Sequence, residues 1–477
     1  MDTREFAERI FLNLPYDPND QQIQLIAALA RFCSADTPSD SVFLLNGYAG
    51  TGKTSLTGAL VRALREAGVP TVLMAPTGRA AKVFGAFARQ PATTIHRRIY
   101  RGNENGFMNY FGDVADNTFQ GAVFIIDEAS MIGNNASDGS STPLSAGNLL
   151  DDLIHYVYSG EGCRMILLGD TAQLPPVGCV ESPAMNTDTL RGYGLRVTRA
   201  VMTEVVRQNH QSGILFNATW LRKAMLRNPL PEPRLTVERF SDVKCVSGEE
   251  LEECIGASYS AKEIAGTLLV TRSNNRAVKF NIAIRTRILG RDEELCRDER
   301  LLVAKNNYLW SAKIKGLDFV ANGDIAEVEQ IYGTETKYGF RFADVRLRLP
   351  DRDIDFDCKI LLDTLTSDAA SLPPDRFNEL YTGALNDPDL FTPSTSIKNR
   401  MKMLRSDPYV NAPQVKSAYA VTCHKAQGGQ WRDVYVDMGY IPPEAYGNID
   451  FYRWLYTAVT RATECLYMVN PAENLIR

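Results

Sequence analysis

Short runs of hydrophobic residues, each followed by glycine or polar turn residues, recur in both halves of the chain. They cover residues 42–45, 71–75, 123–126 and 165–168 in the first half, and 267–270, 418–421, 434–436 and 466–469 in the second. Continuous hydrophobic runs of this length are typical of parallel strands buried on both faces, especially where a helix-like stretch follows. The pattern therefore predicts two α/β units, each with a parallel sheet.

The stretch between the later runs has a different periodicity. Residues 340–349 alternate hydrophobic and polar side chains, which is the signature of an antiparallel strand with one buried face. Turn residues at 322–324 and 332–335 interrupt the neighbouring sequence, so we expect strands to end there. Residues 305–415 are accordingly predicted to form a small β-domain inserted into the second α/β unit.

Composition and charge narrow the class of protein. The chain has 477 residues, of which 44% are hydrophobic and 23% charged, as in ordinary globular proteins. Its 52 Lys and Arg against 57 Asp and Glu give a net charge of −5, which disfavours a uniformly basic nucleic-acid binder but allows a local basic groove. The nine cysteines form no CxxC pair, so we expect reduced thiols in a cytoplasmic protein. No hydrophobic run approaches the roughly 18 residues of a membrane helix.

A glycine-rich segment directly follows the first predicted strand. Residues 47–54, GYAGTGKT, match the pattern GxxxxGK[ST], whose backbone N–H groups cradle phosphates at a helix N-terminus. In this geometry Lys53 meets the β- and γ-phosphate oxygens and Thr54 ligates Mg²⁺. The residues predicted to contact the nucleotide are Gly47, Tyr48, Ala49, Gly50, Thr51, Gly52, Lys53 and Thr54.

Two carboxylates follow the predicted strand at 123–126. We expect Asp127 to hold Mg²⁺ and Glu128 to act as the base for the attacking water. A strand that simply ends in solvated acids is the alternative, and the phosphate loop in the same chain disfavours it. The sequence thus predicts ATP and Mg²⁺ as cofactors.

One region of the chain is rich in cations and free of acids. Residues 67–103 contain no Asp or Glu, so the rest of the protein carries a charge of −11. The six cations in this region are Arg79, Lys82, Arg89, Arg97, Arg98 and Arg101. Such segregation favours contacts with nucleic-acid phosphates over a solvated helical face. A second group, Lys398, Arg400, Lys402 and Arg405, is equally consistent with an extension of this track or with a solvated helix.

Seven segments occur in a fixed order: GYAGTGKT, APTGRAAK, IIDEAS, GDTAQLPPV, TEVVRQ, VTCHKAQG and YTAVTRA. With this set the chain resembles the superfamily 1 DNA helicases, most closely their RecD/Dda-like branch. The resemblance implies two RecA-like P-loop domains with ATP between them, a small inserted pin domain and an SH3-like β-domain. The expected ranges are 1–93 and 122–200 for domain 1A, 94–121 for 1B, 201–304 and 416–477 for 2A, and 305–415 for 2B.

The resemblance also implies roles for single residues near ATP. Gln22 is the expected adenine-reading residue, with Gln21 as the alternative register. Arg207 and Arg461 are expected to reach the γ-phosphate from the second domain, where a guanidinium stabilises transition-state charge. Gln173 is the expected water-positioning residue. Gln427 is expected where the ATP and DNA sites communicate.

The expected DNA-binding residues come from both halves of the chain. They are Pro76, Thr77, Arg79, His96, Arg97, Arg98, Thr422, His424 and Lys425. For His424, a satisfied core histidine is the alternative. In the predicted 1B segment, Phe107, Met108, Tyr110 and Phe111 either form a strand-separating pin that stacks on the last base pair or pack the hairpin onto the first domain.

These expectations together describe an ATP-dependent helicase of bacterial or phage-like type. By resemblance it moves 5′ to 3′ on single-stranded DNA and separates forked or tailed duplex DNA, with single-strand-binding, replication or repair proteins as candidate partners and no membrane contact. An RNA helicase of the same superfamily is one alternative, because 2′-OH contacts are not visible in a sequence. A non-unwinding subunit whose ATP site regulates DNA binding is the other.

Overall fold

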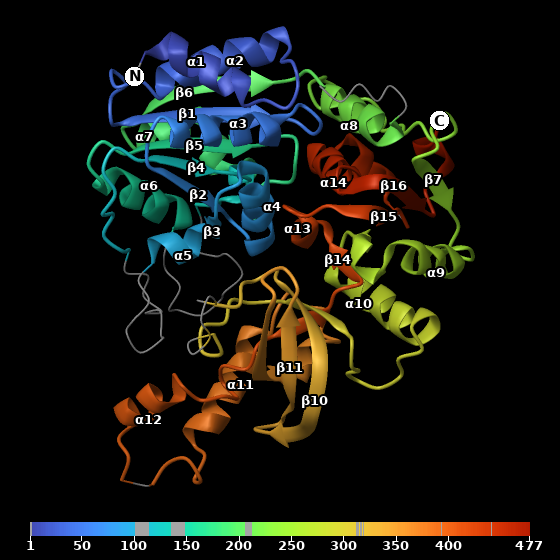
Figure 1. Ribbon diagram of the computed structural model, residues 1–477. Coiled ribbons are helices and arrows are strands. Elements are labelled where there is room, and N and C mark those ends of the chain that lie inside the picture. Colours follow the sequence, from blue (N-terminus) through green and yellow to red (C-terminus); the bar gives the residue numbers. More distant parts are fainter. Residues whose placement is uncertain are drawn as a thin grey trace.

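The structure of the protein is a computed structural model that describes residues 2–100, 114–134, 148–205, 212–311, 314, 317, 319–392, 394–439 and 441–477. Two α/β domains lie side by side, and a third unit with the long strands β10 and β11 lies below them (Figure 1). We call these units the first domain, the second domain and the antiparallel domain. This arrangement agrees with the predicted fold class.

The first domain is built on a six-stranded parallel sheet. Its strands follow the order β3 (Ala92–Thr94), β2 (Thr71–Ala75), β4 (Val123–Ile126), β5 (Arg164–Gly169), β1 (Ser41–Gly47) and β6 (Arg196–Met202). Four of the six correspond to predicted runs. Because β4, β5 and β1 are neighbours and run parallel, the loops after them meet at one edge of the sheet, which is where ligands bind in such folds.

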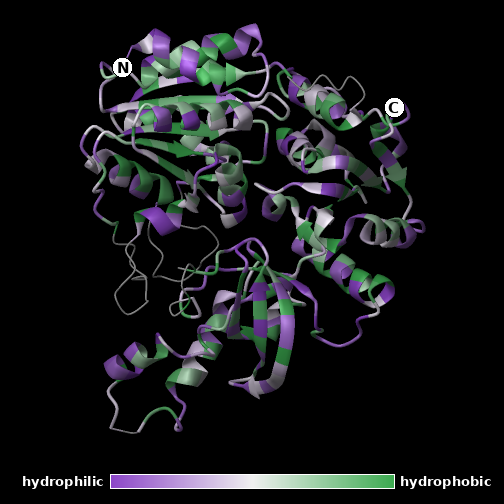
Figure 2. Ribbon diagram, in the orientation of Figure 1, coloured by the Kyte–Doolittle hydropathy of each residue, from purple (hydrophilic) through white to green (hydrophobic). Residues whose placement is uncertain are grey.

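Helices cover both faces of this sheet. One face packs against α1 (Thr3–Leu12), α2 (Asp20–Phe32), α3 (Lys53–Glu66) and α4 (Gly78–Ala88). The other packs against α5 (Ile95–Ile99), α6 (Leu149–Ser159) and α7 (Thr187–Gly192). Figure 2 shows the strands of this sheet as mostly hydrophobic and the outer helix faces as more polar. A sheet covered on both faces explains why its strands read as continuous hydrophobic runs.

The second domain repeats this plan with a five-stranded parallel sheet. The strand order is β14 (Ala420–Thr422), β8 (Thr267–Thr271), β15 (Trp431–Asp437), β16 (Ala462–Val469) and β7 (Val243–Val246). One face packs against α8 (Gly213–Ala224), α13 (Cys423–Ala426) and α14 (Ile449–Val459). The other packs against α9 (Leu251–Lys262) and α10 (Asn274–Ala283). Short 3₁₀ helices occur in all three units. They are η1 (Ala129–Met131), η2 (Pro183–Met185), η3 (Ile264–Gly266), η5 (Leu362–Thr364), η6 (Pro443–Gly447) and η7 (Glu473–Leu475).

The antiparallel domain has five strands and its own core. Their order is β12 (Ile354–Leu361), β11 (Phe340–Leu349), β10 (Ile325–Lys337), β9 (Arg300–Val303) and β13 (Val415–Ser417). The sheet therefore begins slightly before, and ends slightly after, the predicted insertion. The strand predicted at 418–421 is present as β14, shifted to Ala420–Thr422, in the parallel sheet of the second domain, and the preceding strand β13 joins the antiparallel sheet.

The turn predicted at 332–335 is also wrong. These residues lie inside β10, where the register with β11 shifts between Ile331 and Gly333. A β-bulge accommodates the glycine without ending the strand. The chain turns instead at Tyr338 and Gly339, whose φ angles are 54° and 78°. Both residues adopt the left-handed conformation that tight hairpin turns require.

Two helices extend from the antiparallel domain, α11 (Pro374–Leu385) and α12 (Ile397–Leu404) (Figure 1). The second cationic group lies on and next to α12. Its Arg400 donates to the carbonyl oxygens of Leu385, Thr392 and Thr395 and lies over the Phe391 ring, so this arginine holds the local fold together. No helix among the described residues is long and hydrophobic enough to cross a membrane.

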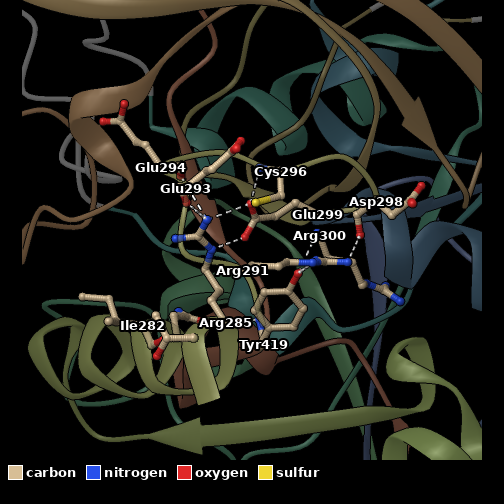
Figure 3. Close-up of polar contacts among 12 residues, drawn as sticks. Ile282, Arg285, Arg291, Glu293, Glu294, Cys296, Asp298, Glu299, Arg300 and Tyr419 are labelled. Atoms are coloured by element: carbon tan, nitrogen blue, oxygen red, sulfur yellow. Dashed lines mark hydrogen bonds and ion pairs between the residues drawn. The ribbon is translucent and has the colours of Figure 1, made fainter. Parts of the chain in front are cut away.

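A buried ion pair lies where the antiparallel domain joins the second domain (Figure 3). Glu299 is 1% exposed and accepts hydrogen bonds from the Arg285 guanidinium and from the Cys296 N–H. Arg285 belongs to the π-helix η4 (Ile284–Ile288). Nearby, Arg291 donates to the Tyr419 hydroxyl. These contacts satisfy the buried charges and fasten the root of the antiparallel domain.

Candidate active site

The phosphate loop connects β1 to α3. Gly50 and Gly52 have φ angles of 77° and 82°, a conformation that L side chains rarely adopt. A β-carbon on Gly50 would also lie 2.9 Å from Leu215 Cδ2. The helix α3 begins at Lys53 with Gly52 as its N-cap, so no side chain of the cap occupies its first N–H groups. The loop thus presents a helix N-terminus suited to an anion.

Lys53 lies among carboxylates at the edge of the sheet. Its Nζ is 3.9 Å from Asp127 Oδ1, and both side chains are largely buried. Burial by itself lowers the pKa of Lys53, but the nearby Asp127, Glu128 and Asp170 outweigh it and hold that pKa above its usual value. Burial raises the pKa of Asp127, and Lys53 opposes this. Lys53 is therefore a permanent cation beside the loop.

Three buried polar atoms around the loop make no hydrogen bond to any described residue. They are Glu128 Oε2, Ser130 Oγ and Gln173 Oε1. Glu128 also has a positive φ of 52°, and its N–H donates to Asp127 Oδ1 at 2.9 Å. Buried polar atoms without partners are rare in folded proteins, and strained residues cluster at functional sites. This cluster is therefore suited to a polar ligand such as a nucleotide and its water.

The donor set also fits Mg²⁺. Asp127 offers a carboxylate and Thr54 a hydroxyl, and hard oxygen ligands are those that Mg²⁺ prefers. The described residues contain no cluster of three His, Cys, Asp or Glu suited to a metal. Mg²⁺ bound with a nucleotide takes only one or two protein ligands, since phosphate and water supply the rest. The residues present are thus compatible with Mg²⁺-nucleotide.

Arg461 is buried in the second domain. Its guanidinium donates to the carbonyl oxygens of Thr457 and Gly429, each at 3.0 Å, and to Thr460 Oγ1 at 3.1 Å. Its charge is near enough to oppose the protonation of Lys53. These three hydrogen bonds are all within the second domain, so Arg461 is held in place by its own domain.

Tyr456 and Thr457, on α14, bridge the two domains. The Tyr456 hydroxyl donates to Asp170 Oδ2 at 2.7 Å and accepts from the Ala49 N–H at 3.0 Å. Thr457 Oγ1 accepts from the Leu174 N–H at 2.9 Å. Sequence reasoning missed these bridging roles, although Tyr456 and Thr457 lie in the YTAVTRA segment and Asp170 in GDTAQLPPV. The second domain therefore touches both the phosphate loop and the loop after β5.

Gln427, predicted near the nucleotide, takes part in the same bridge. Its Nε2 donates to the Leu174 carbonyl at 2.7 Å. Another contact that sequence reasoning missed is Arg222, whose guanidinium lies 4.4 Å from the centre of the Tyr48 ring. A lone arginine in a helix carries no signal of such a role. Both contacts connect the second domain to the edge of the first domain that carries the phosphate loop.

The two candidate adenine-reading glutamines have different surroundings. Gln22 is buried, forms a capping box with Asn19, and donates to the Thr51 carbonyl of the phosphate loop at 3.2 Å. Gln21 is on the outside of α2 and bonds the Thr203 hydroxyl and N–H. Of the two, Gln22 is the one in contact with the loop.

Three of the first-domain residues predicted to bind DNA lie directly after β2. Pro76 precedes Thr77, whose hydroxyl caps α4. Arg79 donates to the Gln430 carbonyl at 2.9 Å and lies 4.0 Å from the centre of the Trp431 ring in the second domain. Burial lowers the pKa of Arg79 to about 10. Arg79 is thus an interdomain contact in this structure.

A cleft of about 510 Å³ separates the first domain from the antiparallel domain. One wall carries Lys82, Arg89 and Arg97, and the other carries Asp324, Asp351 and Arg352. Lys82 Nζ lies 3.2 Å from Asp351 Oδ1 across it. Cations from residues 67–103, the region without Asp or Glu, therefore line one wall of this cleft.

The side chains of His96 and Arg98 are less exposed to solvent than that of Arg97. Burial lowers the pKa of His96 to about 4, so its imidazole is neutral at pH 7, and its ring lies 5.7 Å from that of Tyr100. Arg98 lies 5.8 Å from the centre of the Phe119 ring, and its buried Nε makes no hydrogen bond to a described residue. The lining of the cleft includes Arg97 but neither His96 nor Arg98.

The second-domain residues of the predicted track meet the first domain at a small crevice. Thr77, Arg79, Lys425 and Gln427 all line this crevice, whose volume is about 30 Å³. Burial, followed by the charge of Lys416, lowers the pKa of Lys425 to about 8. Lys425 donates to Asn322 of the antiparallel domain. The three units of the fold thus converge here.

The last second-domain candidates flank the start of α13. Thr422 is the N-cap residue of that helix. Desolvation and the adjacent Lys425 lower the pKa of His424, so a neutral imidazole is expected at pH 7. Arg207, Arg101 and the predicted pin residues Phe107, Met108, Tyr110 and Phe111 lie outside the described residues.

Comparisons with known proteins give two family matches. Residues 19–227 match the AAA domain, and residues 417–469 match the UvrD-like helicase C-terminal domain. Together the two models match more than half of the chain. The first match covers most of the first domain and extends through α8 of the second domain, and the second match covers β14 to β16 of the second domain.

Two curated relatives are similar in sequence. The ATP-dependent RecD2 DNA helicase of Deinococcus radiodurans is 34% identical over 134 residues, which are 28% of this chain and 16% of the relative. An uncharacterized protein of Methanocaldococcus jannaschii is 23% identical over 463 residues, which are 91% of this chain and 37% of that protein. The chain thus spans well under half of the length of either relative.

Solved structures similar to this chain include Pif1 helicases. The Pif1 helicase from Candida albicans aligns with a TM-score of 0.46 and 16% identity, covering 97% of this chain and 96% of that one. Pif1 helicase from Bacteroides, in complex with ADP-AlF3 and ssDNA, aligns with a TM-score of 0.45 and 14% identity, covering 96% and 94%. The ordered motifs, the paired parallel-sheet domains and the two family matches make this chain similar to the superfamily 1 helicases.

Proposed function

We propose that this protein is an ATP- and Mg²⁺-dependent DNA helicase that moves 5′ to 3′ along single-stranded DNA and separates duplex DNA. The observation that carries the proposal is the cluster beside the phosphate loop. Lys53 is ionised next to Asp127, while the buried Glu128 Oε2 and Gln173 Oε1 have no partner among the described residues. In a purely structural charge cluster, the buried polar atoms would all be paired with one another. This one is suited to a phosphate, a metal and a water.

The residues divide the hydrolysis step among themselves. Thr54 and Asp127 would hold Mg²⁺, which would offset the negative charge of the ATP phosphates around the bond that breaks. Lys53 places a positive charge at the β- and γ-oxygens. Glu128 accepts the proton of the attacking water, which Gln173 orients. Arg207 and Arg461 stabilise the charge that develops on the γ-phosphate.

The location of Arg461 links hydrolysis to domain movement. Its guanidinium is held by carbonyls of the second domain, so its distance from the phosphate changes when the two domains move relative to each other. Under this proposal domain 1A covers 1–93 and 122–200, 2A covers 201–304 and 416–477, and the insertions 1B and 2B cover 94–121 and 305–415. Cycles of closure and opening then move the domains along one strand.

The DNA track follows from where the cations gather. Lys82, Arg89 and Arg97 line the cleft facing the antiparallel domain, and Lys425 lines the adjoining crevice. Contacts of this kind bind phosphates and carry no base preference. The relative from Deinococcus radiodurans is named a DNA helicase, which supports DNA over RNA as the partner.

An ATPase assay with and without nucleic acid tests the proposal. We expect single-stranded DNA to stimulate hydrolysis and a fork with a 5′ tail to be unwound faster than one with a 3′ tail. Stimulation by RNA alone would favour the RNA-helicase alternative. Stimulation by DNA without unwinding of either fork would favour an ATP-regulated DNA-binding subunit.

A further inference from the structure

Tyr456 has an unusual set of partners for a buried tyrosine. It is 1% exposed and lies on α14 of the second domain, but both hydrogen bonds of its hydroxyl cross to the first domain. One partner is the Ala49 N–H of the phosphate loop, and the other is the Asp170 carboxylate after β5. One hydroxyl thus contacts two loops that border the nucleotide site.

Asp170 depends on this hydroxyl. The carboxylate is 1% exposed, and its Oδ1 accepts from the Ala172 N–H at 2.9 Å. Its Oδ2 accepts from Tyr456 at 2.7 Å. Removing a donor from a buried carboxylate is costly because the charge is left unsatisfied. The bridge is therefore a strong and directional link between the two domains.

The same end of α14 carries the support of Arg461. The Arg461 Nε donates to the Thr457 carbonyl, and Thr457 Oγ1 accepts from the Leu174 N–H. Tyr456 and Thr457 are adjacent, so both fasten this turn of α14 to the loop after β5. A change in how that loop meets α14 moves the backbone oxygen on which Arg461 rests.

We propose that Tyr456 is a positioning residue that ties the phosphate loop and Asp170 to the segment holding Arg461, so that domain closure delivers Arg461 in register. This proposal rests on the proposed function. It assigns a task to a hydroxyl that the hydrolysis step itself does not use. Tyr456 acts through Arg461 and does not donate to the nucleotide.

Another tyrosine on α14 provides a matched control. Tyr452 lies one turn earlier and is also fully buried, but its hydroxyl donates to the Pro231 carbonyl, away from the phosphate loop. Tyr456→Phe and Tyr452→Phe each remove one buried hydroxyl from the same helix and keep the ring. They differ in whether the hydrogen bonds that disappear join the second domain to the first.

The experiment compares steady-state ATP hydrolysis by the full chain on single-stranded DNA. For Tyr456→Phe we expect kcat to fall about tenfold while KM for ATP and the Kd of a non-hydrolysable ATP analogue change by about twofold or less. Tyr452→Phe should keep kcat within about twofold. Thermal melting of both variants shows whether each remains folded at the assay temperature.

Three outcomes would overturn the proposal. These are an unchanged kcat in Tyr456→Phe, an equal loss of kcat in both variants, and a loss confined to ATP affinity. Failure of the proposed function is distinguishable from all three, since the wild-type protein would then show no hydrolysis stimulated by DNA. If wild type is stimulated and Tyr456→Phe equals it, only the positioning role fails.

Discussion

Two buried charge clusters in this protein differ in how they are satisfied. At the root of the antiparallel domain, Glu299 accepts from Arg285 and from a backbone N–H, and Arg285 also donates to carbonyl oxygens (Figure 3). Beside the phosphate loop, Lys53 and Asp127 are 3.9 Å apart, and Glu128 Oε2 has no partner among the residues described. One cluster is complete within the protein, and the other is not.

The difference separates a structural site from a functional one. Burying a charge is costly unless it is paired and hydrogen-bonded. The root cluster meets this condition with its own side chains and backbone, so it fastens two domains. The loop cluster has buried acceptors left over and a strained backbone at Glu128, which a ligand would have to compensate. Substitutions in the loop cluster should therefore reduce ATP hydrolysis and leave stability intact, whereas substitutions in the root cluster should reduce stability and leave hydrolysis intact.

The largest effect is expected from Lys53→Ala. This change removes the side-chain cation beside the phosphates, so ATP hydrolysis should fall by at least about a thousandfold, while DNA binding survives. Lys262→Ala is the matched control, because Lys262 pairs with the buried Asp433 at 3.0 Å in the second domain. Hydrolysis by Lys53→Ala near the wild-type rate would show that the loop cluster is not the ATP site.

Glu128→Gln should separate binding from turnover. The amide keeps the size of the side chain but cannot accept a proton, so kcat should fall by about a hundredfold or more with ATP binding retained. Because Glu128 Oε2 has no partner among the described residues, the melting temperature should stay equal to wild type or rise. If Glu128→Gln hydrolyses ATP at the wild-type rate on DNA, the base is another residue.

Glu299→Gln should show the reverse behaviour. It leaves the Arg285 guanidinium without its buried counter-charge, and we expect the free energy of unfolding to fall by about 3 kcal/mol. ATP hydrolysis should be near normal at temperatures where the variant is folded. Glu252→Gln, which breaks the exposed pair with Arg287 on the same π-helix, should leave stability almost unchanged. Loss of hydrolysis by folded Glu299→Gln would remove the distinction between the clusters.

A smaller effect is expected at the crevice around Lys425, where DNA affinity should depend on pH. The pKa of Lys425 is about 8, so its positive charge is present below pH 8 and disappears as the pH rises through that value. If Lys425 contacts DNA phosphate, affinity for single-stranded DNA should fall a few fold between pH 7 and pH 9, on the order of 1 kcal/mol. Lys425→Arg keeps its charge and should abolish this dependence. A dependence that survives in Lys425→Arg would belong to another group, with Lys416 the first candidate.

The smallest effect concerns Arg97 on the cleft wall and the adjacent Arg98. Neutralising Arg97 and Arg98 should weaken single-strand binding evenly across sequences and lower the salt slope by about 0.7 for each DNA phosphate that the variant no longer neutralises. Neutralising Lys398 and Lys402 on α12 removes the same charge at a distant site. Equal slopes for wild type and the Arg97 and Arg98 variant would place the cleft outside the DNA path. A lower slope for the α12 variant would extend the path to that helix.

Local chemistry explains which parts of the fold were predictable. Buried strands such as β2 and β11 have the bounds that periodicity predicted, because hydrophobic alternation or continuity follows from which faces are buried. The turn assigned around Tyr332 failed because a glycine also fits a β-bulge, and only pairing with β11 shows which applies. Short strands such as β3 were missed because three residues carry too little periodicity.

The sequence by itself determined the two parallel sheets, the phosphate loop and the carboxylates after β4, because turn chemistry and strand periodicity act over a few residues. The tertiary structure alone decided which groups close on one another. The Tyr456 hydroxyl meets Asp170 at a separation of 286 residues, and Gln427 meets Leu174 across 253. Such contacts depend on how two domains pack, and no local pattern encodes that packing. The same packing leaves Glu128 Oε2 without a hydrogen-bond partner among the described residues. It gives the Glu299 carboxylate two partners, Arg285 and the Cys296 N–H, although each glutamate lies next to a short strand.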